Sequence, residues 1–597
     1  MMDDDTDPLA DGFALQVERW ALAQGDDAVT AARVRHAAHA LSLATSEGHV
    51  CLPLADLNAG ENPRRVLLSS GVVGTPAEPG ARPLMLDDDD RLYLHRYFDF
   101  ERRLAQRLTR AAAAQPAVVD AATQRHLNAL FDPQAGPDWQ KIAAALALRQ
   151  RLVVVSGGPG TGKTTTVVNL LACLIEQNPN VRVALAAPTG KAAARMSEAL
   201  RLRAGHLPPD VRERLPAQAS TVHRLLGAFP GGFTHHAGRP LAIDALVVDE
   251  ASMLDLALAT KLLEAVPETA RLILLGDKDQ LAAVESGAVF AELSADPTLS
   301  VACTADLARL CELPAAAIVP GTPLQASPLR DSVVWLTRNF RFAADSGIAL
   351  AAANVRDGRS DELLLRLRQG EDAALHWLDD GNVAPAAATW QCMRDGYADY
   401  LQSVRDGGQD IAAITRAFER FRVLCAVREG RRGVEAINRQ LADEARVLLA
   451  PGSTTPWFAG RPVMLLRNDP LLKLFNGDIG ITLPGADGAL LVHFADATGG
   501  FRAVPAMRLP PHETAFAMTV HKAQGSEFDE VLVLLPAQRS RVLTRELLYT
   551  ALTRARRRVL LAADAVVLAS AVAARTRRQS GLLARLRDTS AVHSQSV

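Results

Sequence analysis

The sequence predicts an α/β fold with two parallel-sheet domains, and three observations support this. From residue 139 onward, short apolar runs alternate with helical patterns, as in a parallel sheet covered by helices. A second set of such runs follows after residue 340. Within the first set, a glycine-rich turn lies directly between an apolar run and a helical pattern. Since 597 residues are enough for about three or four domains, other domains are expected as well.

The composition is that of an ordinary globular protein, with 48% hydrophobic and 22% charged residues. The formal net charge of −2 argues weakly against nucleic-acid binding and does not exclude it, because a groove needs only locally clustered Arg and Lys. The 6 cysteines form no C-x-x-C pair, which disfavours a zinc site, an iron–sulfur cluster or a disulfide framework. No run of about 18 apolar residues occurs, and the acidic start is unlike a signal peptide. We therefore expect a cytoplasmic protein without a membrane segment.

The first segment, residues 1–115, is expected to form a mostly helical docking domain. It has helical periodicity, then a stretch rich in Pro and Gly, and it carries no pattern typical of a catalytic site. Apolar and polar residues alternate at 91–97, and residues 101–108 indicate a helix with charged outer positions. The alanine-rich residues 111–122 are expected to lead as a helix into the next domain.

The second segment, residues 116–345, holds the most specific motif. The apolar run 152–156 leads into Gly157-x-x-x-x-Gly162-Lys163-Thr164, a phosphate-binding loop whose backbone N–H groups and following helix attract phosphate. Lys163 is expected to reach the β- and γ-phosphates of ATP, and the Thr164 hydroxyl to hold Mg²⁺. The predicted nucleotide-binding residues of the loop are Gly157, Gly158, Pro159, Gly160, Thr161, Gly162, Lys163, Thr164 and Thr165.

Two further apolar runs end in polar residues, at the sheet edge where α/β proteins bind ligands. The run 246–248 ends in Asp249 and Glu250. We expect Asp249 to hold Mg²⁺ and Glu250 to polarise the attacking water. The run 272–275 is followed by Gln280, which we expect to sense the γ-phosphate.

The third segment, residues 346–597, is expected to contain the second sheet, with apolar runs at 423–427, 531–535 and 559–563. Residues 451–512 are rich in Gly, Pro and short β-like runs, which indicates a small β insertion. In the second segment, residues 227–241 have the composition of a tight turn or hairpin.

Together with several short motifs, these elements resemble the ordered motifs of superfamily 1 helicases, and most closely the RecD family of bacterial exodeoxyribonuclease V subunits. The additional motifs are Trp139-Gln140, Ala187–Ala194, Ser220–Leu226, Asn339–Arg341, Val520–Glu527 and Tyr549–Ala555. The resemblance spans nearly the whole chain. It implies two RecA-like motor domains, an SH3-like insertion at 451–512 and ATP-dependent DNA helicase activity.

The resemblance also implies roles for individual residues. Gln140 would recognise adenine, Arg341 would contact the γ-phosphate, and Arg554 would be the arginine finger. An arginine from a second domain acts only when the cleft closes and contributes about 10³ to 10⁵ in rate. The implied DNA contacts, which position phosphates without reading sequence, are Thr189, Lys191, Thr221, His223, Thr519, His521 and Lys522. For His223 and His521 a structural hydrogen bond is an equally good interpretation.

Related 5′-to-3′ helicases carry a strand-separating pin at the position of residues 227–241. Phe233, His235 and His236 are therefore either pin residues that press against a duplex junction or part of an ordinary surface hairpin.

The same resemblance implies a heterotrimer with RecB-like and RecC-like subunits, which acts on single-stranded and duplex-end DNA in the 5′-to-3′ direction. Residues 48–54 and 91–96, with Tyr97 and Glu101, resemble the domain that docks on RecC. We find no carboxylate cluster with a lysine outside the ATP site, so nuclease activity is expected in a partner. Two alternatives stay open: a stand-alone superfamily 1B helicase, and a DNA-binding ATPase switch that does not unwind.

Overall fold

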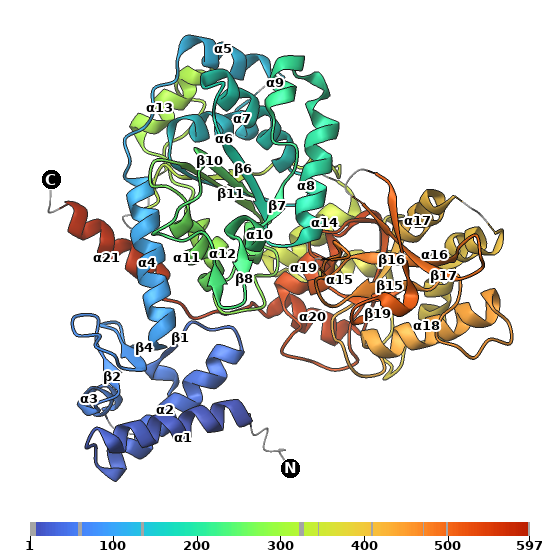
Figure 1. Ribbon diagram of the computed structural model, residues 1–597, viewed down its shortest axis with the longest axis horizontal. Coiled ribbons are helices and arrows are strands. Elements are labelled where there is room, and N and C mark those ends of the chain that lie inside the picture. The colour runs from blue at the N-terminus through green and yellow to red at the C-terminus, as the bar shows by residue number, and fades with distance from the viewer. Residues whose placement is uncertain are drawn as a thin grey trace.

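A computed structural model describes residues 7–57, 62–132, 136–321, 328–343, 345–407, 410–469, 471–496 and 499–594. Residues 1–6 and 595–597, at the ends of the expected first and third segments, lie outside the described residues. Figure 1 shows an N-terminal domain at the bottom, a first α/β domain above it and a second α/β domain to the right. We call the two α/β domains domain 1 and domain 2.

The N-terminal domain is mostly helical, as expected, and also contains a small sheet. Its first two helices pack on each other through alanine and valine side chains, and Asp7 and Asp27 accept hydrogen bonds from backbone N–H groups at the two N-termini. The sheet has the order β1-β4-β3-β2. The elements are α1 (Pro8–Ala23), α2 (Ala28–Ser46), β1 (Cys51–Pro53), α3 (Pro63–Ser69), β2 (Val73–Gly74), β3 (Leu84–Leu86), β4 (Arg91–Leu94) and α4 (His95–Ala112).

Domain 1 is built on a six-stranded parallel sheet of order β12-β5-β11-β10-β6-β7. The apolar runs at 152–156 and 272–275 form its central strands β5 and β11, which confirms the predicted sheet. The elements are α5 (Ala121–Ala129), α6 (Trp139–Arg149), β5 (Leu152–Gly157), α7 (Lys163–Gln177), β6 (Val183–Ala187), α8 (Gly190–Arg203), α9 (Pro209–Arg214), β7 (Ser220–Thr221), α10 (Val222–Leu226), β8 (Ala228–Phe229), β9 (Gly232–Phe233), β10 (Ala245–Val248), α11 (Leu256–Ala265), β11 (Arg271–Gly276), α12 (Val289–Leu293), α13 (Val301–Leu310) and β12 (Val333–Leu336).

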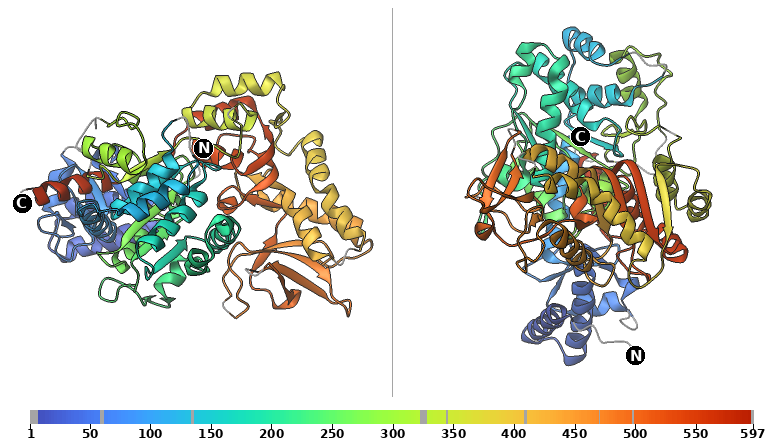
Figure 2. Two further views of the ribbon diagram at one scale, coloured as in Figure 1. Left: turned by 90° about the horizontal axis from the view of Figure 1, so that it is seen from above. Right: turned by 90° about the vertical axis from the view of Figure 1, so that its right-hand side faces the viewer.

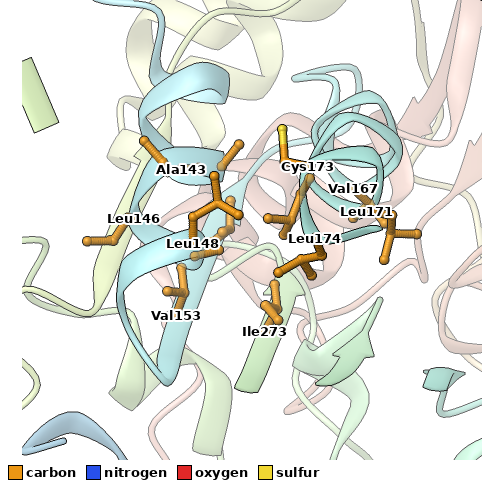
Figure 3. Close-up of a cluster of buried hydrophobic side chains, with 14 of the residues drawn as sticks. Ala143, Leu146, Leu148, Val153, Val167, Leu171, Cys173, Leu174 and Ile273 are labelled. Atoms are coloured by element: carbon orange, nitrogen blue, oxygen red, sulfur yellow. The ribbon is translucent and has the colours of Figure 1, made fainter. Parts of the chain in front are cut away.

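Helices cover both faces of this sheet. On one face, side chains of α6 and α7 pack on β5 and β11, as Figure 3 shows for Leu148, Leu171 and Ile273. On the other face, α4, α11 and α12 pack against the same strands. Because both faces are buried, the strands consist of continuous apolar runs, which is why the sequence revealed them.

Domain 2 repeats this arrangement with a five-stranded parallel sheet of order β13-β22-β21-β14-β20. The expected β insertion is a separate five-stranded antiparallel sheet of order β18-β17-β16-β15-β19 with its own small core. Its likeness to an SH3 domain stays a prediction. The elements are α14 (Gly347–Asp357), α15 (Ser360–Gln369), β13 (Leu375–Asp379), α16 (Ala387–Arg405), α17 (Ile411–Arg420), β14 (Phe421–Cys425), α18 (Val434–Leu449), β15 (Pro462–Leu465), β16 (Ile479–Pro484), β17 (Leu490–Ala495), β18 (Phe501–Pro505), β19 (His512–Thr514), β20 (Ala517–Thr519), β21 (Phe528–Leu534), α19 (Arg545–Leu552), β22 (Ala555–Ala563) and α20 (Ala565–Ala573).

The chain does not end in domain 2, although we expected the third segment to do so. Residues 574–581, which we call the C-terminal strap, cross back to domain 1, and α21 (Leu582–Ser594) packs beside α4 (Figures 1 and 2). Leu582 and Leu586 join the core beneath α4, and Arg585 forms an ion pair with the buried Asp87 at 2.8 Å. The strap and α21 thus bind the N-terminal domain to domain 1.

The expected helix over residues 111–122 is wrong. Helix α4 ends at Ala112, and α5 begins at Ala121. Pro116 lies between them, and the residue before a proline is biased away from helical geometry. The Asp120 side chain then accepts from the Thr123 N–H at 2.7 Å and starts a new helix. Alanine content alone could not reveal this break.

Candidate functional site

The phosphate-binding loop lies between β5 and α7, at the edge where the parallel strands end. Gly160 and Gly162 have φ values of +85° and +81°, which only glycine adopts readily. The Lys163 amine donates to the Gly157 carbonyl and lies 3.3 Å from the carbonyl oxygen of Gly158. The Gln140 side-chain amide donates to the Thr161 carbonyl at 2.8 Å. Gln140 therefore lies against the loop, although it comes from the preceding helix.

The predicted acidic residues and Gln280 lie at the same sheet edge. Asp249 and Glu250 follow β10, and Glu250 has a φ of +52°, which is uncommon for a non-glycine residue. Burial and the neighbouring Glu250 raise the pKa of Asp249 to about 6, while the charge of Lys163 opposes this rise. Gln280, after β11, is buried, and its Nε2 donates to Asp277 Oδ2 at 3.0 Å.

The two predicted arginines meet around one carboxylate where the domains touch. Arg341 donates to Glu527, and Arg195 of α8 lies 2.8 Å from the same carboxylate. Arg554, only 2% exposed, donates to the Thr550 and Ser526 carbonyls, and its charge acts on both Arg341 and Glu527. Burial alone would raise the pKa of Glu527, but Arg195 and Arg341 hold it well below its usual range. The structure thus brings both arginines into one seam.

This seam adjoins the phosphate-binding loop. The Phe340 N–H donates to the Gly160 carbonyl at 2.8 Å, and the Asn339 side-chain amide donates to the Pro159 carbonyl at 2.9 Å. A Cβ atom at Gly160 would lie 2.7 Å from Asn339 Oδ1, so any other residue there would collide with this segment. Arg341 is therefore held against the loop that carries Lys163.

The residues present fit a nucleoside triphosphate with a divalent cation. Arg341 Nη1 is buried and has no hydrogen-bond partner among the described residues, so it has a donor to offer an anion. Burial and the nearby Glu250 raise the pKa of Asp249, and a bound cation would favour its ionised form. The Thr164 hydroxyl and the Asp249 carboxylate are oxygen ligands of the kind that Mg²⁺ prefers.

Two predicted DNA contacts, Thr189 and Thr221, are helix caps, and a third, Thr519, binds the backbone of the turn after β20. Thr189, Thr221 and Thr519 each begin a helical turn, and their hydroxyl oxygens accept from backbone N–H groups at 3.2, 3.2 and 3.3 Å, respectively. These hydroxyls fix where α8, α10 and the turn after β20 begin. Because the three threonines lie at or just after the ends of β6, β7 and β20, they are placed at the carboxyl-terminal edge of each sheet.

The histidine and lysine predictions differ in their surroundings. The ring of His223 is exposed and lies 6.0 Å from the Phe233 ring, measured between centroids. His521 is half-buried, and burial lowers its pKa, with a contribution from Arg578. The Lys522 amine pairs with Glu513 of β19 at 3.0 Å, which links the strand ends to the β insertion.

Lys191 lies between the domains. It is half-buried, and its amine lies 5.9 Å from the centroid of the Phe528 ring in domain 2. Burial lowers the pKa of Lys191 to about 8, and the charge of Arg422 contributes in the same direction. Lys191 therefore carries a proton at neutral pH and loses it under mildly alkaline conditions.

Residues 227–241 contain the hairpin β8–β9, but Phe233 does not lie at its tip. Phe233 is half-buried, and the Lys261 amine lies 5.3 Å from its ring centroid. The His235 ring is within 3.3 Å of the Arg239 carbonyl, and His236 pairs with Arg239. The exposed aromatic residue next to the turn is Phe229, at 55% exposure. Sequence reasoning missed it, although alternation along a two-stranded hairpin places Phe229 and Phe233 on opposite faces.

Phe340 is a second residue that sequence reasoning left without a role. Its side chain is 52% exposed beside Gly160, and the Arg338 guanidinium lies 4.8 Å from its ring centroid. An exposed aromatic ring at a phosphate-binding loop offers a flat surface on which a nucleobase can stack. The sequence feature that could have indicated an exposed Phe340 was its place as a large apolar residue between two polar ones in Asn339-Phe340-Arg341.

Across the part of the chain that the structure describes, no group of three or more His, Cys, Asp or Glu side chains is arranged to hold a metal ion. None of the described helices combines the length and the apolarity that crossing a bilayer requires.

Two family models match the chain in the regions that carry these features. An AAA domain model matches residues 140–286, which include the phosphate-binding loop and the ends of β10 and β11. A model of the UvrD-like helicase C-terminal domain matches residues 514–562, which include Glu527 and Arg554.

Curated relatives match over most of the chain. The RecBCD enzyme subunit RecD of Mycobacterium tuberculosis is 40% identical over 560 residues, which cover 92% of this chain and 88% of that protein. The RecBCD enzyme subunit RecD of Haemophilus influenzae is 34% identical and covers 83% of this chain and 80% of its own length. The ATP-dependent RecD2 DNA helicase of Deinococcus radiodurans is 31% identical over 92% of this chain, but the match spans only 68% of that protein.

We expect binding of single-stranded DNA to weaken between about pH 7 and pH 9, because Lys191 loses its proton as the pH rises through about 8. If Lys191 contacts a DNA phosphate, the loss of this cation should lower the affinity about three- to tenfold at constant ionic strength. Fluorescence anisotropy with a labelled oligonucleotide measures this.

The matched control is Lys191→Arg, because a guanidinium keeps its proton throughout this range. Its affinity should change far less with pH. If wild type and Lys191→Arg respond equally to pH, Lys191 is not the titrating contact.

Proposed function

We propose, on the premise that the chain belongs to the RecD family, that this ATP-dependent DNA helicase moves 5′ to 3′ along single-stranded DNA as a subunit of a RecBCD-type helicase–nuclease in double-strand-break repair. Family membership follows from the 40% identity to a RecD subunit over most of both chains. The direction of movement, the partner subunits and the residue roles are our proposals.

One observation carries the motor mechanism. Arg341 and Arg554 gather around Glu527 beside the phosphate-binding loop, and they belong to the two sides of one seam between parallel sheets. Lys163 comes from the loop of domain 1 and Arg554 from domain 2. A ligand with several negative charges would therefore be bound by both domains at once, which favours closure of the seam.

ATP hydrolysis places charge on phosphate oxygens, and the chain supplies cations for it. We assign Lys163 to the β- and γ-phosphates and Arg341 and Arg554 to the charge that develops on the transferred group. Arg341 Nη1, which is buried and without a hydrogen-bond partner among the described residues, supports its assignment. Gln140 and Phe340 flank the loop, so we assign them to the adenine base.

The acidic residues complete the reaction. We assign Thr164 and Asp249 to Mg²⁺, which when bound would neutralise phosphate charge. We assign Glu250 to polarising the attacking water; its backbone φ of +52° is uncommon for a non-glycine residue and marks a strained position at this sheet edge. Gln280 reports on the γ-phosphate position from the end of β11.

Movement along DNA follows from opening and closing of the seam. Lys191, Thr189, Thr221 and His223 belong to domain 1, and Thr519, His521 and Lys522 to domain 2. If both groups contact phosphates, each closure of the seam shortens the distance between the two DNA-binding sites on one strand, and each opening lengthens it. If the two domains bind the strand tightly in alternation, the cycle produces translocation.

The N-terminal domain offers a surface for partner subunits. Helix α1 lies at the end of this domain that is remote from domain 1 (Figure 1), and it exposes Leu9 at 75% and Trp20 at 42%. Residues 48–54, which belong to the domain expected to dock, face domain 1 and the strap: Gly48 accepts from the Gly287 N–H, and Val50 donates to the Gln579 carbonyl. We therefore propose that α1 contacts the RecC-like subunit.

All 6 cysteines are free thiols, in keeping with a reducing cytoplasm.

A stand-alone helicase is the second candidate. It is favoured by the 31% identity to the RecD2 DNA helicase, but that match leaves almost a third of the relative uncovered. The RecD subunits are more similar and match over most of their length. A protein that fails to assemble with RecB-like and RecC-like subunits, yet unwinds DNA alone, would support this second candidate.

Lys163→Gln should reduce DNA-stimulated ATP turnover by about 10³ or more, because it removes the cation of the loop without touching the core. Lys141→Gln, in the same domain but bonded to the Cys311 carbonyl, is the control and should keep its activity. Duplexes with 5′ or 3′ single-stranded tails then test direction. Substantial turnover by Lys163→Gln, or preferential unwinding of the 3′-tailed duplex, would contradict the proposal.

We place the pin contact of the β8–β9 hairpin at the exposed Phe229, so Phe229→Ala should slow unwinding of a tailed duplex about fivefold or more, because an aromatic contact with a base contributes about 1–3 kcal/mol. Single-strand-stimulated ATP turnover should stay near the wild-type rate, since Phe229 lies outside the cleft. Phe229→Trp should retain unwinding. An Ala variant that unwinds normally would make β8–β9 an ordinary surface hairpin.

Trp20→Glu should weaken assembly with the RecB-like and RecC-like subunits by about 30-fold, as expected for an aromatic residue at the centre of an interface. ATP turnover of the free chain should not change. Leu365→Glu, on an exposed position of α15 at 59%, is the control. Equal assembly of all three proteins in size-exclusion chromatography would exclude α1 as the docking surface.

A further inference from the structure

The loop after β11, residues 277–281, is held by side chains of domain 2. The Tyr549 hydroxyl of α19 donates to Asp277 Oδ2 at 3.2 Å. The Leu281 N–H donates to Thr550 Oγ1 at 3.0 Å, and the Gln524 side-chain amide donates to the Leu281 carbonyl at 2.9 Å. All three bonds are buried and join the two α/β domains.

Asp277 is the charged centre of this contact. It is 2% exposed, and it accepts from the Asp279 N–H, from Gln280 and from Tyr549. Burial raises the pKa of Asp277, and the nearby charge of Lys163 opposes this rise. A buried carboxylate depends strongly on each donor that it keeps, because no water replaces a lost one.

Tyr549 reaches the phosphate-binding loop itself. A Cβ atom at Gly158 would lie 2.9 Å from the Tyr549 hydroxyl oxygen, so the missing side chain of this glycine provides the space for that hydroxyl. The Tyr549 ring is 7% exposed. A residue of domain 2 thus stands against two parts of domain 1, the loop and Asp277.

The same helix leads to Arg554. Tyr549 lies in the last turns of α19, and Arg554 Nε donates to the Thr550 carbonyl of that helix at 3.2 Å. Whatever fixes α19 against the loop therefore also fixes the guanidinium of Arg554. Gln524, whose side chain binds the Leu281 carbonyl, lies close in sequence to Lys522, which we assign to DNA contact.

We propose that Tyr549 and Asp277 are a positioning pair that holds the seam closed and keeps Arg554 beside the phosphate-binding loop. This inference rests on the proposed function, because it assigns the pair to ATP turnover. Neither residue touches the reacting atoms. The hydroxyl–carboxylate bond forms only when the domains meet, so it stabilises the closed arrangement relative to the open one.

Tyr549→Phe removes the hydroxyl and keeps the ring. In the full chain with saturating single-stranded DNA, we expect kcat for ATP to fall about tenfold, the size of effect typical for a lost hydrogen bond to a carboxylate. The KM for ATP should stay within about twofold, because every residue assigned to nucleotide binding remains. Because a smaller folded fraction would also lower the apparent kcat at an unchanged KM, kcat is expressed per folded molecule, with the folded fraction taken from thermal denaturation; a merely structural role would then leave it at the wild-type value.

Asp277→Asn provides the second arm. It should lower kcat in the same way, and the double variant should be no slower than the slower single variant, because the two residues act as one unit. Losses that multiply in the double variant would overturn the pairing.

The control is Tyr400→Phe. It removes another buried tyrosine hydroxyl of domain 2, one that donates to the Gly460 carbonyl at 2.7 Å away from the seam. Its kcat should match the wild type. If Tyr400→Phe and Tyr549→Phe lose the same activity, the effect comes from stability and the inference fails.

The outcomes separate this inference from the proposed function. Substantial turnover by Lys163→Gln would reject the proposed function, whatever Tyr549→Phe does. If Lys163→Gln is inactive and Tyr549→Phe keeps the wild-type kcat, only the positioning pair is rejected.

Discussion

The half-buried carboxylate of Glu527 joins the two α/β domains at the cleft. Glu527 accepts Arg195 from α8, Arg341 from the segment after β12 and Arg556 from β22, so cations from both α/β domains share a single negative charge. These guanidiniums would repel one another in a half-buried seam if that charge were missing. Their gathering also explains why the pKa of Glu527 is held so low. The cleft is therefore already organised for an anion, and a phosphate would compete with Glu527 for the same donors.

Much of the fold could be predicted because it depends on local patterns. Strands buried on both faces require continuous apolar runs, so β5, β10 and β11 were visible in the sequence, and the glycine-rich loop could be placed between β5 and α7. The contents of the cleft depend on long-range contacts instead. Nothing near Glu527 in the sequence indicates that Arg195 will contact it. The expectation that Arg341 and Arg554 lie in the cleft came only from the family resemblance.

The remaining differences have similar causes. Pro116 and Asp120 end one helix and start another within an alanine-rich stretch, where composition outweighed local signals in our expectation. Phe233 packs inward and Phe229 outward because strand alternation decides the face, which composition does not show. Thr189 and Thr221 are helix caps and Thr519 binds the backbone of the turn after β20, so residues expected at DNA also define local backbone structure. A substitution there would alter the backbone as well as a contact.

The C-terminal strap limits how the two α/β domains can move. Thr576 donates to Glu546 in domain 2, and Arg578 donates to backbone carbonyls of domain 1 around Gly287. Only Arg577 separates these anchors along the chain, and consecutive Cα atoms are about 3.8 Å apart, so the backbone between them is short. While both anchors hold, the two domains stay close together at this point. Residue 577 then lies near the axis of an opening motion, so the gap between domain 1 and domain 2 widens with distance from this residue.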